Sequence, residues 1–177
     1  TMSLFESGES TGKVSLKAIM EGQDIGTIDE AVDLSHIVDL VIGGGWPGGL
    51  NMSYEDRATA VKGYLESAIA DACSIDNVHR KESYFRLIIK SLARNECTLA
   101  STSKIHSDTG IPMDGKMERI VEDSDIDKPP IAYDTVTDYL DVLNRLYLIE
   151  DQPAFDPNLK SSTRVGKTSK RHLTDPS

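Results

Sequence analysis

Apolar residues recur three and four positions apart over much of this chain, which is the pattern of amphipathic helices. Within residues 28–42 the apolar face consists of Leu34, Ile37, Val38 and Val41. A second helix begins after Ser53, whose hydroxyl can cap the first turn, while an acidic residue three positions later can cap back. The apolar face of this helix is Val61, Tyr64, Leu65, Ala68, Ile69 and Ala72. The chain is therefore predicted to be mainly α.

Three more helices are predicted in the second half. The segment 82–95 places Phe85, Ile88, Ile89 and Leu92 on one face, residues 101–107 form a shorter helix, and a helix starting near Asp134 buries Val136, Tyr139, Leu140, Leu143 and Leu146. After it, Leu148-Ile149 and Ala154-Phe155 around Gln152-Pro153 predict the two arms of a small β-hairpin. This order of elements is typical of a winged helix-turn-helix, which we predict over residues 81–159.

The other segments complete the predicted organisation. Residues 1–27 are predicted to form two short extended pieces around a loop, Met2-Ser3-Leu4-Phe5 and Val14-Ser15-Leu16, and so to leave a short strand remnant at the N-terminus. Residues 28–80 form a helical region interrupted by a Gly-Trp-Pro loop at 43–49, where no regular helix can continue. An acid-rich insert lies at 114–127 within the predicted winged helix, and residues 160–177 form a basic segment.

Charge argues against a general affinity for nucleic acid. The net charge is −10, and because residues 160–177 carry five basic residues against Asp175 alone (+4), the preceding residues carry −14. The exposed positions of the last predicted helix are Asp134, Thr137, Asp138, Asp141 and Arg145. Each carboxylate near a phosphate costs on the order of 1 kcal/mol, without the counterion release that drives DNA binding. DNA is thus a possible but not a favoured partner, and the residues that could contact it are Lys167, Lys170 and Arg171.

The segments that resemble catalytic or cofactor-binding motifs each lack a residue or an element that the motif requires. Residues 8–14 resemble a P-loop, but three residues instead of four separate the glycines, and Val14 stands where a hydroxyl should hold Mg²⁺. Residues 43–48 match the letters of a dinucleotide fingerprint without the preceding strand. The histidines are scattered, and Cys73 and Cys97 lack metal-ligand spacing, which predicts two reduced thiols. We therefore predict no catalytic, cofactor-binding or metal-binding residue in this chain.

Three residues outside the basic segment are candidates for interaction. Trp46 is predicted to anchor neighbouring helices from its loop. Arg94 and Asn95 close an amphipathic helix and are candidates for partner contact. An equally good interpretation of this pair is capping of the helix C-terminus, by Arg near the last carbonyls and Asn in a left-handed turn.

Several segments together resemble a known family, the prokaryotic ATP-binding proteins with an AAA-type ATPase core and a C-terminal nuclease-like domain of unknown function. The similar segments, in the family's order, are Met2-Ser3-Leu4-Phe5-Glu6-Ser7-Gly8-Glu9-Ser10, Gly44-Gly45-Trp46-Pro47, Leu92-Ala93-Arg94-Asn95, Thr135-Val136 with Tyr139-Leu140, and Lys170-Arg171-His172 with Asp175-Pro176-Ser177. They extend over the whole chain, and it is their combination that carries the resemblance.

The resemblance implies that this chain is an internal fragment of such a protein. In the family the P-loop lies upstream, residues 2–10 resemble the last strand region of the ATPase core, and a domain similar to restriction endonucleases follows downstream. The resemblance then implies an interdomain winged-helix module whose partners are the ATPase core and the nuclease-like domain of the same protein. ATP and Mg²⁺ are expected for the intact ATPase, with no cofactor in this chain. No run of apolar residues approaches a membrane span, and a cytoplasmic location is expected.

Overall fold

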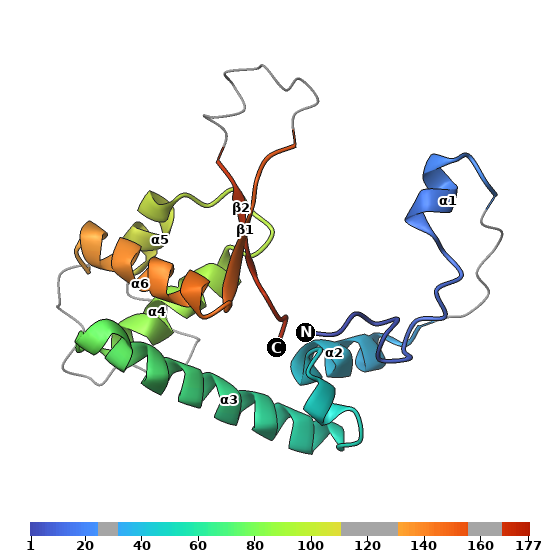
Figure 1. Cartoon of the computed structure of the whole chain (residues 1–177), viewed down its shortest axis with the longest axis horizontal. Coiled ribbons are helices and arrows are strands. Elements are labelled where there is room, and N and C mark those ends of the chain that lie inside the picture. The colour runs from blue at the N-terminus through green and yellow to red at the C-terminus, as the bar shows by residue number, and fades with distance from the viewer. Residues whose placement is uncertain (25–31, 111–130, 156–167) are drawn as a thin grey trace. The chain divides into compact units, whose positions relative to one another are not determined.

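The computed structural model describes residues 1–24, 32–110, 131–155 and 168–177, and is mainly helical with one small antiparallel sheet (Figure 1). Its elements are α1 (Leu16–Met20), α2 (Leu34–Gly43), the short 3₁₀ helix η1 (Pro47–Gly49), α3 (Tyr54–Ser74), the 3₁₀ turn η2 (Ile75–Asn77), α4 (Glu82–Arg94), α5 (Thr102–Asp108), α6 (Tyr133–Arg145), β1 (Ile149–Gln152) and β2 (Lys170–Leu173). None of these helices is both long and apolar enough to cross a membrane. The chain divides into two units, one of Thr1–Leu65 with Asp175–Ser177 and one of Glu66–Thr174.

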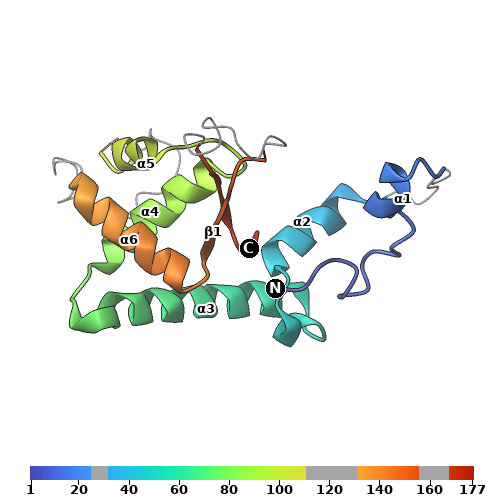
Figure 2. The same ribbon diagram turned by 45° about the horizontal axis from the view of Figure 1, so that its top comes forward.

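The second unit holds nearly all of the buried apolar residues. Helices α4, α5 and α6 gather beside the two strands (Figure 2). The core consists of Ile69, Ala72, Phe85, Ile88, Leu92, Ile105, Ile131, Val136, Tyr139, Leu140, Val142, Leu143 and Ile149. The rings of Phe85 and Tyr139 lie 4.4 Å apart, and the Tyr139 hydroxyl accepts a hydrogen bond from the Lys81 amide at 2.6 Å. Burial of each large apolar side chain contributes about 1.5–3 kcal/mol to the free energy of unfolding. The apolar residues that recur three and four positions apart in α4 and α6 therefore supply much of the stability of this unit.

The helices of the second unit match the sequence prediction closely. Helix α4 buries three of the four predicted core residues, and the fourth, Ile89, is half-buried. Helix α5 is capped by Ser101, whose hydroxyl accepts a hydrogen bond from the Lys104 amide. Helix α6 buries all of its predicted core residues except Leu146, which is half-buried. The predicted insert at 114–127 lies outside the described residues.

The second arm of the predicted hairpin is wrong. Strand β1 contains Ile149 as predicted, but it pairs antiparallel with β2 from the predicted basic segment, while Phe155 is 88% exposed. In the observed register, Ile149 lies opposite Leu173 and Asp151 lies opposite Arg171. An apolar pair and an opposite-charge pair both favour this register. Residues 154–155 have no such partners, and the preceding Pro153 cannot donate to a ladder.

The predicted strand remnant near the N-terminus is also wrong within the described residues 1–24. Leu16–Met20 forms the short helix α1, where the Ser15 hydroxyl accepts a hydrogen bond from the Ala18 amide at 3.3 Å. Residues 4–9 form turns, and the Glu6 carboxylate accepts hydrogen bonds at 2.8 Å from the amide and hydroxyl of Ser3. These local bonds satisfy polar groups that an isolated strand would leave without a partner.

Helices α2 and α3 confirm the two helices predicted for the first half. The Asp33 carboxylate caps α2, and the Ser53 hydroxyl accepts a hydrogen bond from the Asp56 amide at the start of α3. The predicted start of the first helix, residues 28–31, lies outside the described residues. The apolar face of α2 is not buried: the exposed fractions of Leu34, Ile37, Val38, Val41 and Ile42 lie between 43% and 72%.

Candidate functional site

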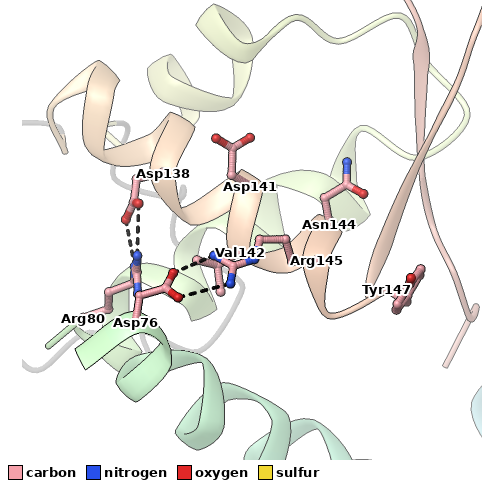
Figure 3. A pocket seen from close by; sticks show the side chains of 8 residues that line it. All are labelled: Asp76, Arg80, Asp138, Asp141, Val142, Asn144, Arg145 and Tyr147. Carbon is pink, nitrogen blue, oxygen red and sulfur yellow. Dashed lines mark hydrogen bonds and ion pairs between the residues drawn. The ribbon is translucent and has the colours of Figure 1, made fainter. Parts of the chain in front are cut away.

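Charged side chains surround a hollow beside the outer face of α6 in the second unit. Figure 3 shows the eight residues that line this shallow hollow of about 550 Å³. They are Asp76, Arg80, Asp138, Asp141, Val142, Asn144, Arg145 and Tyr147. The positions predicted to be exposed on this helix, including Asp134, Thr137, Asp138, Asp141 and Arg145, are all exposed in the structure. We call this surface the α6 face.

Arg80 is the most constrained residue of the α6 face. It follows η2, where Asp76 and Asn77 adopt left-handed backbone conformations (φ 61° and 55°) that reverse the chain between α3 and α4. Asp and Asn tolerate this region better than most residues. The Arg80 side chain is only 5% exposed; it donates to both oxygens of Asp138 at 2.7 and 3.0 Å and to the Ile75 carbonyl at 2.9 Å.

A second, more exposed arginine pair lies beside the first. Arg145 donates from two nitrogens to the Asp76 carboxylate, at 2.6 and 3.2 Å, and both side chains are more than half exposed. Hydrogen bonding to Arg80 lowers the pKa of Asp138, and hydrogen bonding to Arg145 lowers the pKa of Asp76. Both carboxylates are therefore ionised at neutral pH, and both pairs are charged on each side.

The α6 face has little capacity for anions. Three carboxylates, those of Asp76, Asp138 and Asp141, stand against two guanidinium groups, which leaves a net charge of −1. Both guanidinium groups already bind carboxylates in the two-pronged manner that they use for phosphate. The face also presents Tyr147, which is 82% exposed and adopts a left-handed conformation (φ 57°) that is uncommon for a bulky residue. Tyrosine and arginine side chains are enriched in protein interfaces.

Trp46 lies in the first unit, in a loop that brings distant parts of the sequence together. Its indole N–H donates to the Ser177 hydroxyl at 3.3 Å, and its ring lies 4.3 Å from that of Tyr64 in α3. The neighbouring Gly45 amide donates to the Asp175 carboxylate at 2.9 Å, and the Gly45 carbonyl accepts from the Met2 amide at 2.7 Å. The glycines of this loop thus allow the residues at the two ends of the chain to pack closely against it.

Asn95 belongs to a buried polar cluster at the end of α4. Its side-chain amide donates to the Ser91 carbonyl at 2.7 Å and to the Asp108 carboxylate at 2.8 Å. Asp108, which is 5% exposed, also accepts from the Ser91 hydroxyl at 2.9 Å and from Lys104 at 2.5 Å. Burial raises the pKa of Asp108, but the hydrogen bonds from Lys104, Asn95 and Ser91 outweigh it, and the net shift is downward.

The structure therefore gives Asn95 the capping role. It caps α4 with its side chain, although its backbone (φ −100°) is not in the left-handed conformation that the sequence suggested. Arg94, in contrast, is exposed in the last turn of the helix, where a positive charge complements the helix dipole.

The predicted basic candidates do not form one surface among the described residues. Lys167 lies outside them. Lys170 is exposed at the start of β2, whereas Arg171 donates to the Asp151 carboxylate at 2.8 and 3.3 Å. The one basic residue of this pair that points into solvent is therefore Lys170.

Three side chains that no sequence pattern links also lie together in the structure. Glu96, Cys97 and His172 place one oxygen, sulfur or nitrogen atom each within 4.8 Å of one another. Sequence spacing offers no signal for this cluster, because His172 lies 76 residues after Glu96. Both cysteines, the half-buried Cys73 and the exposed Cys97, are free thiols.

Among known proteins, the chain matches a family model and no individual protein. No curated protein and no solved structure matches the chain. A family model described as a domain of unknown function (DUF8612) matches residues 34–177, from the first residue of α2 to the end of the chain. The chain therefore belongs to the family of this domain of unknown function, DUF8612.

Proposed function

We propose that residues 82–173 form a winged helix that makes protein contacts between the domains of a larger ATP-binding protein and performs no chemistry of its own. In this proposal α4, α5 and α6 are its three helices and the β1–β2 pair is its wing. The neighbouring domains are an AAA-type ATPase core and a nuclease-like domain, as the resemblance of the sequence implies.

The observation that carries the proposal is the charge pairing on the α6 face. In a DNA-binding winged helix the third helix enters the major groove and needs Arg, Lys, Asn or Gln toward the bases. Here Asp134, Asp138 and Asp141 are exposed along that helix, and its one arginine is bound to Asp76. A face of this kind repels the phosphate backbone and is suited to polar or cationic protein surfaces.

The exposed apolar face of α2 supports contact with further polypeptide. Leu34, Val38 and Val41 point out of the first unit with exposed fractions of 72%, 47% and 45%. A continuous apolar stripe on a helix is usually covered by another part of the protein or by a partner. In the proposed arrangement this covering surface belongs to the ATPase core.

Three of the segments that carry the family resemblance lie in contact within the first unit. Met2, Gly45 and Asp175 belong to different segments, and hydrogen bonds join them around one loop. Because hydrogen bonds join residues from three of the similar segments, these contacts support the proposal that the chain shares a local structure with the ATP-binding proteins.

The coding DNA on both sides of this segment tests the proposal. We expect an in-frame strand and a true P-loop upstream, with four residues between its glycines and a Ser or Thr after its Lys. We expect an acidic, lysine-containing nuclease motif downstream. A start codon beside Thr1 with a stop codon after Ser177 would contradict the interdomain role.

The competing function is a DNA-binding regulator that uses Lys167, Lys170 and Arg171. It predicts binding to duplex DNA that weakens steeply with salt and is lost when these three residues are neutralised. Fluorescence anisotropy of a labelled duplex at low ionic strength measures this. We expect no salt-dependent binding by the 177-residue chain, and a steep salt dependence that requires the three residues would favour the regulator.

A further inference from the structure

We propose that Glu96, Cys97 and His172 form a binding site for a zinc ion. The nearest atoms of Glu96 and His172, Oε1 and Nδ1, are 2.7 Å apart, and the Cys97 sulfur lies 3.7 Å from the same Glu96 oxygen. A carboxylate, a thiol and an imidazole are the three side-chain types that zinc binds in proteins. This site is separate from the α6 face and from the proposed interdomain role.

The fold builds the cluster from two elements that are far apart in the sequence. Helix α4 ends at Arg94, so Glu96 and Cys97 follow in the connection to α5, while His172 lies in β2. Strand β2 runs beside the C-terminal end of α4 (Figure 2). Cys97 adopts a left-handed conformation (φ 60°), which is uncommon for a residue with a side chain and turns the backbone sharply at the cluster.

Two of the three side chains are already oriented by neighbouring groups. The second Glu96 oxygen, Oε2, accepts a hydrogen bond from the Leu173 amide at 3.0 Å, which directs Oε1 toward His172. The His172 Nε2 lies 3.3 Å from the Gln152 side-chain oxygen. Without an ion, Nδ1 carries the proton of the hydrogen bond to Glu96 Oε1, because two lone pairs would otherwise face each other at 2.7 Å. On zinc binding this proton leaves Nδ1 and the neutral ring takes a proton from solvent on Nε2, where the Gln152 oxygen accepts it. The lone pair of Nδ1 is then free for the ion. Metal-binding histidines are commonly held in this way by a second polar group.

One of the distances between the ligand atoms already matches a tetrahedral zinc site, and all three atoms lie within 4.8 Å of one another. Zinc lies about 2.0–2.2 Å from nitrogen and oxygen and about 2.3 Å from sulfur, so ligand atoms stand roughly 3.3–3.8 Å apart. The sulfur–oxygen distance already falls in this range. The Glu96–His172 hydrogen bond opens by well under 1 Å as the ion replaces it. Cys97 loses its thiol proton to water on binding, and its exposure leaves a fourth position for a water ligand.

A bound ion would link the end of α4 to β2. Strand β2 is four residues long and has β1 as its sole partner among the described strands. Because an ion that binds the folded state alone stabilises it by mass action, zinc should raise the unfolding temperature of the chain. This gives a second measurement that does not depend on any activity.

Competition with a chromophoric zinc chelator tests the site in the 177-residue chain. We expect binding of one zinc ion per chain. In separate titrations Co²⁺ should give a thiolate-to-metal absorption band, since sulfur is a ligand. Cys97→Ser and His172→Gln should each weaken zinc binding at least about tenfold, and Gln152→Ala should weaken it by about tenfold through the lost orientation of His172.

Matched variants separate this site from unspecific binding. Cys73→Ser removes the other thiol, and His79→Gln removes an exposed histidine outside the cluster. Both should keep wild-type affinity, the cobalt band and the zinc-dependent rise in unfolding temperature. Absence of one-to-one binding by the wild-type chain would overturn the proposal. Unchanged affinity in Cys97→Ser, a variant at an exposed position that should fold normally, would overturn it equally.

Discussion

The bond between Arg80 and Asp138 is predicted to be the strongest single polar link on the α6 face. We consider the variant Asp138→Ala, which removes the carboxylate that accepts hydrogen bonds from Nε and Nη2 of Arg80 at 2.7 and 3.0 Å. The guanidinium group then keeps the Ile75 carbonyl as its remaining acceptor among the described residues. Because the Arg80 side chain is 5% exposed, water cannot easily replace the lost carboxylate.

The magnitude follows from the burial of the two partners. Breaking a fully buried ion pair costs about 3–5 kcal/mol, while an exposed pair contributes about 0–1 kcal/mol. Arg80 is nearly buried, whereas the side chain of Asp138 is 51% exposed. We therefore expect a loss of about 2 kcal/mol, which is about a thirtyfold change in the unfolding equilibrium.

Urea denaturation followed by circular dichroism measures this loss. With a slope of about 2 kcal/mol per molar urea, the midpoint should fall by about 1 M. The matched control is Asp141→Ala, one turn further along the same helix, where an exposed carboxylate is removed with the same gain in helix propensity. Arg145→Ala, which breaks the exposed pair with Asp76, should also leave the midpoint nearly unchanged.

Equal shifts of the midpoint in Asp138→Ala and Asp141→Ala would contradict a strong bond between Arg80 and Asp138. Such a result would mean that Arg80 finds other partners or water at no cost. A double-mutant cycle with Arg80→Ala checks that the loss belongs to the pair, because the coupling free energy should account for most of it.

Three further outcomes are expected from other parts of the chain. The pKa of Asp108 is lowered in the folded state, so its stabilising contribution is present above the ordinary pKa of about 3.9 and is lost as the pH falls through the folded-state value. Between about pH 5 and about pH 3, urea titrations should show a smaller loss of stability for Asp108→Asn than for wild type, and equal losses would contradict this. Gly44→Ala should lower the unfolding temperature, because φ is +61° and the added Cβ would overlap the Asp175 carboxylate. The control Gly48→Ala should leave the unfolding temperature unchanged, because its Cβ meets no atom within 4 Å. Similar unfolding temperatures of the two variants would contradict a steric role for Gly44. Tyr147→Asn should raise the unfolding free energy by about 0.5 kcal/mol through relief of left-handed strain, and a decrease would show that the exposed ring packs on the protein.

The sequence predicts the helices well because their signals are local. Periodic apolar residues such as Phe85, Ile88 and Leu92 place the buried face of α4, and the complementary positions of α6 are exposed as expected. Ser53 and Ser101 mark helix starts through hydrogen bonds that span only three residues. Interactions over so few residues can be predicted from the local sequence alone.

The errors concern partners that are distant in the sequence. Strand β1 has a local signal, but its partner Lys170–Leu173 is chosen by cross-strand pairs about 20 residues away. The same limit applies to the sites. Arg80 meets Asp138 across 58 residues, and Glu96 meets His172 across 76, so no local spacing reveals either contact. Near the N-terminus, alternation over a few residues predicted a strand where a three-residue side-chain bond favours turns instead.

The most direct test of the interdomain role is hydrogen–deuterium exchange of α2 in the protein translated from the complete coding sequence. We expect the amides of Leu34–Gly43 to exchange at least about tenfold more slowly there than in the 177-residue chain, because another domain covers the exposed apolar face. Equal exchange rates of α2 in the two proteins would contradict the interdomain role.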